Sequence, residues 1–275
     1  MLLDLLLLGI TKTAEYPSGF FGFSLGPSTS SFHSEPSDLM DYPQASFFQT
    51  DFQTKGLRAS FAYSVWITGM PAYSLGFLYL KEKLSFFGGC SGLSSSLSLF
   101  SESGEAAGSM IYSFGKFGLG GALRMGKFSF GFSYLRISEN IDGDAASSSA
   151  FSFGALFSGK KLRFSAGAFD LSSESGGPYI SISYVSPSGV NLSSAFSSRK
   201  TVGKSLSFAV GKSVDLNRGV LVFLARKDFY LDYSDLSFLY NSNLAVVFRG
   251  SGFNLGYAMS FKGELGLAHR LFLSI

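Results

Sequence analysis

The sequence predicts an all-β protein that forms a closed antiparallel transmembrane β-barrel, and three observations support this prediction. Apolar residues alternate with small ones, at a period of two, almost everywhere after residue 44. The second face of the predicted strands carries serine, glycine and alanine, whereas a water-facing surface is usually rich in charged side chains. Charged residues make up 15% of the chain, against roughly 25% in soluble domains, and there are 31 phenylalanines.

The stretch GKFSFGFSY at residues 126–134 shows the pattern most clearly, because one face is aromatic and the other carries almost no side chain. In hydrocarbon every backbone polar group must be paired within the protein, so strands can cross a membrane only as a closed ring. We therefore expect lipid against the phenylalanines and an enclosed interior against the serines and glycine. Tyrosines near predicted strand ends would form the interfacial girdle: Tyr112, Tyr134, Tyr184, Tyr233 and Tyr240. The alternative is a secreted sandwich or an aggregating β-protein.

Three segments follow along the chain. Residues 1–14 are mostly apolar, with Asp4 inside the run, and are expected to be a signal-peptide remnant or a hydrophobic N-terminal segment. Residues 15–43 are expected to plug or line the lumen as a hatch. Residues 44–275 are expected to form the barrel, with about 14 strands (12–16) if each strand and its connections take roughly 16 to 18 residues. Turn-forming residues punctuate this part of the chain, at positions 81–83, 139–144, 158–161, 173–178, 186–189, 249–252 and 261–264.

Composition argues against several classes of function. The net charge of +3 is too small, and its basic residues too scattered, to indicate nucleic-acid binding. Cys90 is the single cysteine, and His33 and His269 are the two histidines. These counts disfavour a disulfide, a metal centre or a catalytic constellation, so we expect no cofactor, no metal site and no enzymatic activity.

Five arginines fall on the small-residue face that the alternation assigns to the lumen, and two aspartates, Asp51 and Asp232, join them. Like charges in a confined interior need partners. The segment between Lys12 and Lys55 holds carboxylates and no lysine or arginine, so Glu35, Asp38 and Asp41 are candidate plug carboxylates. The alternatives are an anionic ligand, or arginines at strand ends that reach water. The arginines are Arg58, Arg124, Arg163, Arg249 and Arg270.

Two short motifs resemble the PorV-like branch of the long-chain fatty acid transporter (FadL-like) superfamily of outer-membrane barrels. The C-terminal stretch KGELGLAHRLFLSI is similar to the last hairpin of that branch, with Gly266, His269 and Arg270 at the matching positions. The stretch EPSDLM at 35–40 resembles the Asn-Pro-Ala-x-Leu element near its N-terminus, with Pro36 and Leu39 kept. The resemblance implies a 14-stranded barrel with an N-terminal segment in or near the lumen.

We therefore expect an integral outer-membrane protein that passively transports small hydrophobic or amphipathic molecules through a plugged lumen. In that case a fatty acid carboxylate is the anionic ligand that the resemblance suggests for the arginines. The alternative is a non-transporting structural or secretion-associated barrel that serves as an envelope docking partner. The expected partners are outer-membrane lipid, the barrel-assembly machinery, and either a hydrophobic small molecule or an envelope protein complex.

Overall fold

The computed structural model describes residues 56–65, 70–100, 106–171, 176–199, 203–231, 242–261 and 267–275. These residues form fourteen strands, whose lengths range from 8 residues in β7, β12, β13 and β14 to 20 residues in β4. The strands are β1 (Gly56–Val65), β2 (Pro71–Lys81), β3 (Leu84–Phe100), β4 (Ala106–Met125), β5 (Phe128–Ile141), β6 (Asp144–Ser158), β7 (Leu162–Phe169), β8 (Gly177–Val185), β9 (Val190–Arg199), β10 (Gly203–Leu216), β11 (Gly219–Tyr230), β12 (Ser242–Arg249), β13 (Asn254–Phe261) and β14 (Leu267–Ser274).

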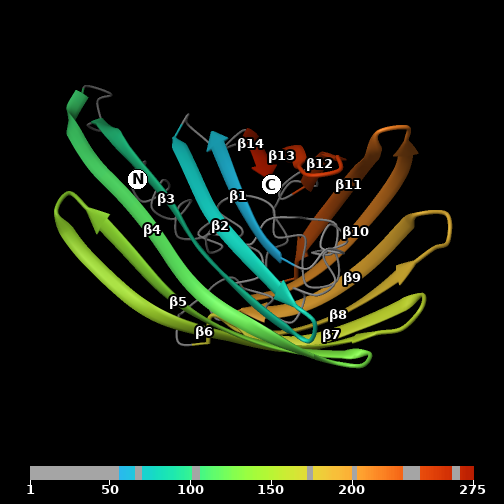
Figure 1. The fold of residues 1–275 in the computed structure, drawn as a ribbon. Coiled ribbons are helices and arrows are strands. Elements are labelled where there is room, and N and C mark those ends of the chain that lie inside the picture. The colour runs from blue at the N-terminus through green and yellow to red at the C-terminus, as the bar shows by residue number, and fades with distance from the viewer. Residues whose placement is uncertain are drawn as a thin grey trace.

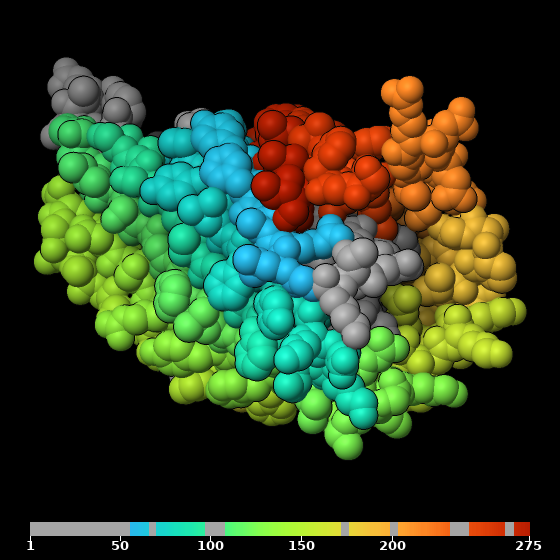
Figure 2. All heavy atoms as spheres, viewed as in Figure 1, coloured from blue at the N-terminus to red at the C-terminus, as the bar shows by residue number. Residues whose placement is uncertain are grey.

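The sheet closes into a barrel, as the sequence predicted. Each strand pairs antiparallel with its sequence neighbours, and β1 pairs with β14 to complete the ring. At this closure Ser60 lies opposite Ser274 and Val65 opposite His269; Figure 2 shows β14 in red directly against β1 in blue. The predicted count of about 14 strands is confirmed. Among the described residues, no helix is long and apolar enough to span a bilayer.

The two ends of the barrel have different connections. At one end six turns of two to four residues join the strands, and we call it the short-turn end. At the other, the long-loop end, the connections run from two to eleven residues. The shortest of these is Asp142–Gly143, where φ values of 53° and 100° give the hairpin geometry that the IDGD sequence favours. Short turns are typical of the periplasmic end of a bacterial barrel, so the short-turn end is expected to face the periplasm.

The exterior is apolar and the interior face is small, as the alternation predicted. In β5 the side chains of Phe128, Phe130 and Phe132 are 48%, 47% and 53% exposed, whereas Ser129 and Ser133 are fully buried. Exposed apolar residues alternate with buried ones in β2, β8, β12 and β13 as well, and the buried ones are mostly small, with Leu78, Leu80 and Tyr179 as larger exceptions. The phenylalanine-rich face is therefore the outer surface of a closed barrel, and its neighbours in a membrane are acyl chains.

The long strands β3–β5 reverse this polarity toward the long-loop end, and in β6 the outer row changes to serine and alanine there. Beyond Tyr134 the outer face of β5 becomes Arg136, Ser138 and Asn140, while Leu135 and Ile137 turn inward and are buried. The pairing of β4 with β5 continues through this point without a register shift, so the change lies in the sequence and not in a bulge. Figure 1 shows β3–β6 as the long green strands, with the short red strands β12–β14 across the barrel from β5 and β6. The long strands therefore carry a polar outer surface beyond the lipid-facing band.

This reversal corrects the prediction for one girdle tyrosine. Tyr112 lies on the inner face of β4, is 4% exposed, and donates a hydrogen bond to Glu139 Oε1 at 2.9 Å. It belongs to the part of β4 in which the large residues point inward. Tyr134 and Tyr184 do lie on the outer face, and Tyr134 packs on Phe151. Tyr233 and Tyr240 lie outside the described residues.

Large inner rings rest on glycines of the neighbouring strand. Phe87 faces Gly120 across the β3–β4 pair, and Phe272 faces Gly256 across the β13–β14 pair. A Cβ at position 120 would lie 2.6 Å from the Phe87 ring and 2.7 Å from the carbonyl oxygen of Phe132. Glycine at this position is therefore a packing requirement, because it leaves room for a ring from the next strand.

We predict that Gly120→Ala lowers the free energy of unfolding by about 1–3 kcal/mol, the usual cost of overpacking. The measurement is the shift of the denaturant midpoint of the folded barrel in lipid vesicles. Gly252→Ala is the matched control, because nothing lies within 4 Å of a Cβ at that position. Equal midpoints for the two variants would contradict the packing explanation.

Candidate functional site

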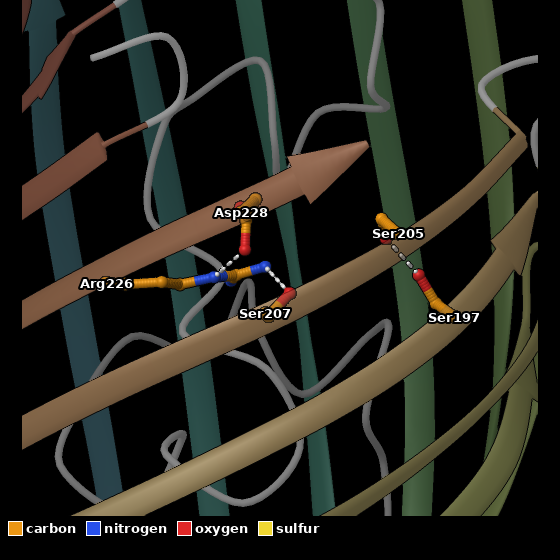
Figure 3. Close-up of polar contacts among 5 residues, drawn as sticks. All are labelled: Ser197, Ser205, Ser207, Arg226 and Asp228. Carbon is orange, nitrogen blue, oxygen red and sulfur yellow. Dashed lines mark hydrogen bonds and ion pairs between the residues drawn. The ribbon is translucent and has the colours of Figure 1, made fainter. Parts of the chain in front are cut away.

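Polar side chains line the inner face of β9–β11 toward the long-loop end. Arg226 Nε donates to Asp228 Oδ1 at 2.7 Å, and Arg226 Nη2 donates to Ser207 Oγ at 3.2 Å. Nearby, the hydroxyl groups of Ser197 and Ser205 are 2.8 Å apart and share a hydrogen bond. Figure 3 shows the five side chains on neighbouring strands. The ion pair is largely buried, so each charge depends on the other for compensation.

A cluster of large apolar side chains joins parts of the wall that are not adjacent. Leu78 and Leu80 of β2 and Phe87 of β3 form one buried cluster with Phe169 of β7 and Tyr179 of β8. The rings of Phe169 and Tyr179 stack with their centroids 5.9 Å apart. Strands β4–β6 separate the two groups in the wall. Side chains from the two sides therefore meet across the interior, and we call this cluster the inner bridge.

A second group of apolar residues covers the inner face at the long-loop end, and we call it the upper patch. It combines two clusters to which Phe114 contributes contacts. The Tyr112–Glu139 hydrogen bond adds a polar group to this surface. The patch consists of Met70, Ala72, Leu93, Tyr112, Phe114, Leu135, Ile137, Ile141, Ala150 and Ala268.

A third group, the lower patch, continues the apolar inner surface toward the short-turn end. The inner row of β14 connects the two patches, because Ala268 belongs to the upper one and Phe272 to the lower one, with Arg270 between them. The lower patch in turn reaches a pocket of about 1050 Å³ at the short-turn end, which Val220 also lines. The lower patch consists of Ala62, Val220, Val222, Leu224, Ala245, Val247, Ala258 and Phe272.

The structure brings two of the predicted lumen arginines together at this pocket. Arg58 of β1 and Arg249 of β12 both line it, together with Arg218 from a turn. Asn254 lines it as well; it is 2% exposed, and its Nδ2 has no hydrogen-bond partner among the described residues. The described lining contains no carboxylate, so the pocket is basic on its polar side.

The other predicted site residues lie apart. Arg270 is 4% exposed and donates from Nη2 to Ser74 Oγ at 3.1 Å, which places it midway along the wall. Arg163 is partly buried near the start of β7, and Arg124 is exposed beside the turn after β4. Whether these arginines contact a plug or a ligand stays a prediction. Residues Asp51, Asp232, Glu35, Asp38 and Asp41 lie outside the described residues.

The Arg226–Asp228 pair was missed from the sequence for a physical reason. The run VLVFLA at 220–225 is apolar on both faces, so alternation does not reveal which way the next residues point. The inward position of Tyr112, which donates to Glu139, could have been predicted from the sequence. In β4 the large residues change from even positions, such as Tyr112 and Phe114, to odd positions, such as Phe117 and Leu119.

No three histidine, cysteine, aspartate or glutamate side chains of the described residues gather as metal ligands.

The closed fourteen-stranded ring and its lipid-facing band define the chain as an outer-membrane β-barrel. No protein-family model matches the chain, and no curated protein matches it in sequence. Its fold is similar to a TodX deltaS2S3 mutant monoaromatic hydrocarbon channel (TM-score 0.57, 7% identity, 82% of this chain and 91% of that one). It is also similar to the Pseudomonas putida toluene transporter TodX (0.54, 9%, 89% and 92%) and to the CymD monoaromatic hydrocarbon channel (0.53, 9%, 92% and 92%).

We predict that Asp228→Asn destabilises the barrel by about 1.5–3 kcal/mol, because the largely buried Arg226 loses a charged hydrogen-bond partner. The free energy of unfolding in lipid vesicles measures the effect. Asp215→Asn removes an exposed carboxylate of neighbouring β10 and should change stability by less than about 0.5 kcal/mol. A smaller loss in Asp228→Asn than in Asp215→Asn would exclude a stabilising role for the pair.

Proposed function

We propose that the protein is a passive outer-membrane channel for small hydrophobic molecules. The observation that carries this proposal is the pair of apolar inner patches, which the inner row of β14 joins past Arg270, with the lower patch reaching the pocket at the short-turn end. Apolar contacts along a route lower the cost of moving an apolar solute through it. The solved structures that share the fold are named as hydrocarbon channels and a toluene transporter, which supports transport and not catalysis.

The interior disfavours the main alternative kind of channel, a water-filled porin. Porin lumens are polar, whereas this interior contains buried Phe87, Phe272, Leu78 and Leu156. The inner bridge also joins two sides of the wall. A hydrated solute would have to lose water to pass such surfaces, but an apolar molecule would exchange one apolar neighbour for another. We infer that the bridge restricts passage to the side of the barrel that β11–β14 and β1 form.

We propose membership of the PorV-like branch on the C-terminal motif, and the structure suggests a role for each of its two polar residues. His269 lies on the outer face, where its Nδ1 is 2.6 Å from the hydroxyl oxygen of Tyr257 on β13. Arg270 points inward and bonds Ser74 of β2. The first contact ties β14 to β13, and the second reaches past β1 to β2, so the motif supports the closure of the barrel. The docking role that this branch suggests stays an alternative prediction.

We also propose that residues 15–43 form a plug whose carboxylates pair with inner arginines. Support comes from the charge distribution: Glu35, Asp38 and Asp41 belong to a stretch without any lysine or arginine. The pocket at the short-turn end offers the matching charge through Arg58 and Arg249. Planar guanidinium groups bind carboxylates well.

The channel proposal predicts faster uptake of an apolar dye. Cells of a channel-deficient Gram-negative strain that produce the protein should take up N-phenylnaphthylamine faster than cells with an empty vector. Ala258→Phe, which adds a ring to the lower patch, should return uptake toward the empty-vector level. Met259→Phe adds the same ring on the neighbouring, outward-facing position of β13 and should leave uptake unchanged.

Hydrolysis of a hydrophilic cephalosporin by a periplasmic β-lactamase serves as the second readout. The proposal expects this rate to stay at the empty-vector level. If the protein accelerated cephalosporin hydrolysis and left dye uptake unchanged, it would be a porin, and the hydrophobic-channel proposal would be wrong.

The plug proposal predicts that deletion of residues 15–43 raises single-channel conductance in a planar bilayer. The charge part of the proposal is tested by Glu35→Gln/Asp38→Asn/Asp41→Asn, which keeps the segment but removes its carboxylates. This variant should show frequent openings that the unmodified chain lacks. Unchanged conductance in the deletion variant would reject the plug.

A further inference from the structure

Exposed basic residues are concentrated at the short-turn end. They lie in or beside four of its six turns, and two further ones, Arg124 and Lys212, lie near the ends of β4 and β10. The described residues of this end carry two exposed carboxylates, Glu82 and Asp215. We call the turn residues the basic rim: Lys81, Lys83, Lys127, Lys160, Lys161 and Arg218.

In the part of the opposite end that the structure describes, there is no such excess. Among its described residues the exposed cations are Arg136 and Lys204, and the exposed carboxylates are Asp142 and Asp144. Within the described residues, the excess of exposed cations is therefore confined to the short-turn end. An excess of cations at one end points to a binding partner that is present at that end.

The basic rim lies directly at the edge of the lipid-facing band. Lys81 continues the outward row of β2 one step past Tyr79, and Lys83 precedes the exposed Leu84. Lys127 lies between exposed Met125 and Phe128. In the same way, Leu162 follows Lys161 and Leu216 lies two residues before Arg218. Long basic side chains in this position keep their stems on apolar surface and hold their charges at the level of the lipid headgroups.

Lys212 shows how the geometry works at a single position. It lies on the outer face of β10 between exposed Val210 and Val214, and its Nζ donates to the carbonyl oxygen of Ser188 in the adjacent turn at 2.6 Å. The side chain of Lys212 therefore starts in the apolar outer row of β10 and places its ammonium group toward the short-turn end. One donor is used by the carbonyl, and two N–H donors of the ammonium group remain to bind an anion.

We propose that the basic rim binds the phosphate groups of anionic phospholipids in the leaflet that surrounds the short-turn end. The basic side chains begin at the outer face and the turns, where lipid is the immediate neighbour. A soluble acidic protein would approach along the barrel axis and would meet the mouth and its pocket first. Headgroup contact also explains why each cation accompanies an exposed apolar residue. This inference does not depend on what the channel carries.

The test measures lipid selectivity of the full-length protein in phosphatidylcholine membranes. Electron paramagnetic resonance with spin-labelled lipids gives the relative association of phosphatidylglycerol and phosphatidylcholine with the barrel surface. We expect phosphatidylglycerol to be preferred by roughly two- to fivefold, in line with the attraction of basic residues to anionic membrane surfaces. The preference should fall toward one in 1 M NaCl, where the Debye length is about 3 Å.

Replacement of all six rim residues by glutamine should remove most of the preference, and only Lys212 and Arg124 then remain as exposed cations among the described residues of this end. Two smaller variants keep the test decisive if the sixfold variant does not fold: Lys160→Gln/Lys161→Gln should reduce the preference, and Arg136→Gln/Lys204→Gln at the long-loop end should not. Dye uptake should be the same in the Lys160→Gln/Lys161→Gln and Arg136→Gln/Lys204→Gln variants, which leave the pocket residue Arg218 in place. Equal association of the two lipids with the unmodified protein would overturn the proposal. The basic rim would then be interpreted as a binding surface for an acidic protein. Loss of preference in the Arg136/Lys204 variant alone would also overturn the proposal.

Discussion

The whole structure depends on the requirement that no backbone hydrogen-bonding group is left unpaired in hydrocarbon. Thirteen of the fourteen strand pairings join consecutive strands, and the pairing of β1 with β14 removes the two remaining edges. Once the ring is closed, the outer face can consist of phenylalanine, leucine and isoleucine, because it needs no polar group of its own. The inner face then has to fill a limited space, which accounts for its serines, glycines and alanines.

Filling that space links packing to function. Inner rings need room, and glycine of the adjacent strand supplies it, as Gly120 does for Phe87. Where β2–β3 and β7–β8 both contribute large residues, their side chains meet in the inner bridge. The remaining route follows the inner row of β14, in which Arg270 lies between the two apolar patches. The same choice between large and small residues therefore determines both the stability of the wall and the kind of molecule that the interior can accept.

Most of the fold could be predicted from the sequence, because a period of two identifies strands and the composition of the second face identifies a closed barrel. The site could be predicted only in part. Arg58 and Arg249 were assigned to the lumen side from the alternation, and in the structure both line one pocket. Tyr112 was assigned to the wrong face, because the alternation in β4 changes phase between Phe114 and Phe117. Arg226 and Asp228 could not be assigned, because the residues before them are apolar on both faces.

The closure of the ring has a consequence for how the protein folds. All hairpins between consecutive strands connect residues that are near in sequence, and such contacts cost little chain entropy. The β1–β14 pairing joins Ser60 to Ser274, and a contact of such long range is formed late in an otherwise local topology. Until this pairing forms, the intermediate is an open sheet with two unpaired edge strands and an exposed apolar face. Both features favour aggregation. The unclosed sheet therefore needs a chaperone to cover it before insertion, just as the closed barrel needs the membrane around its outer face.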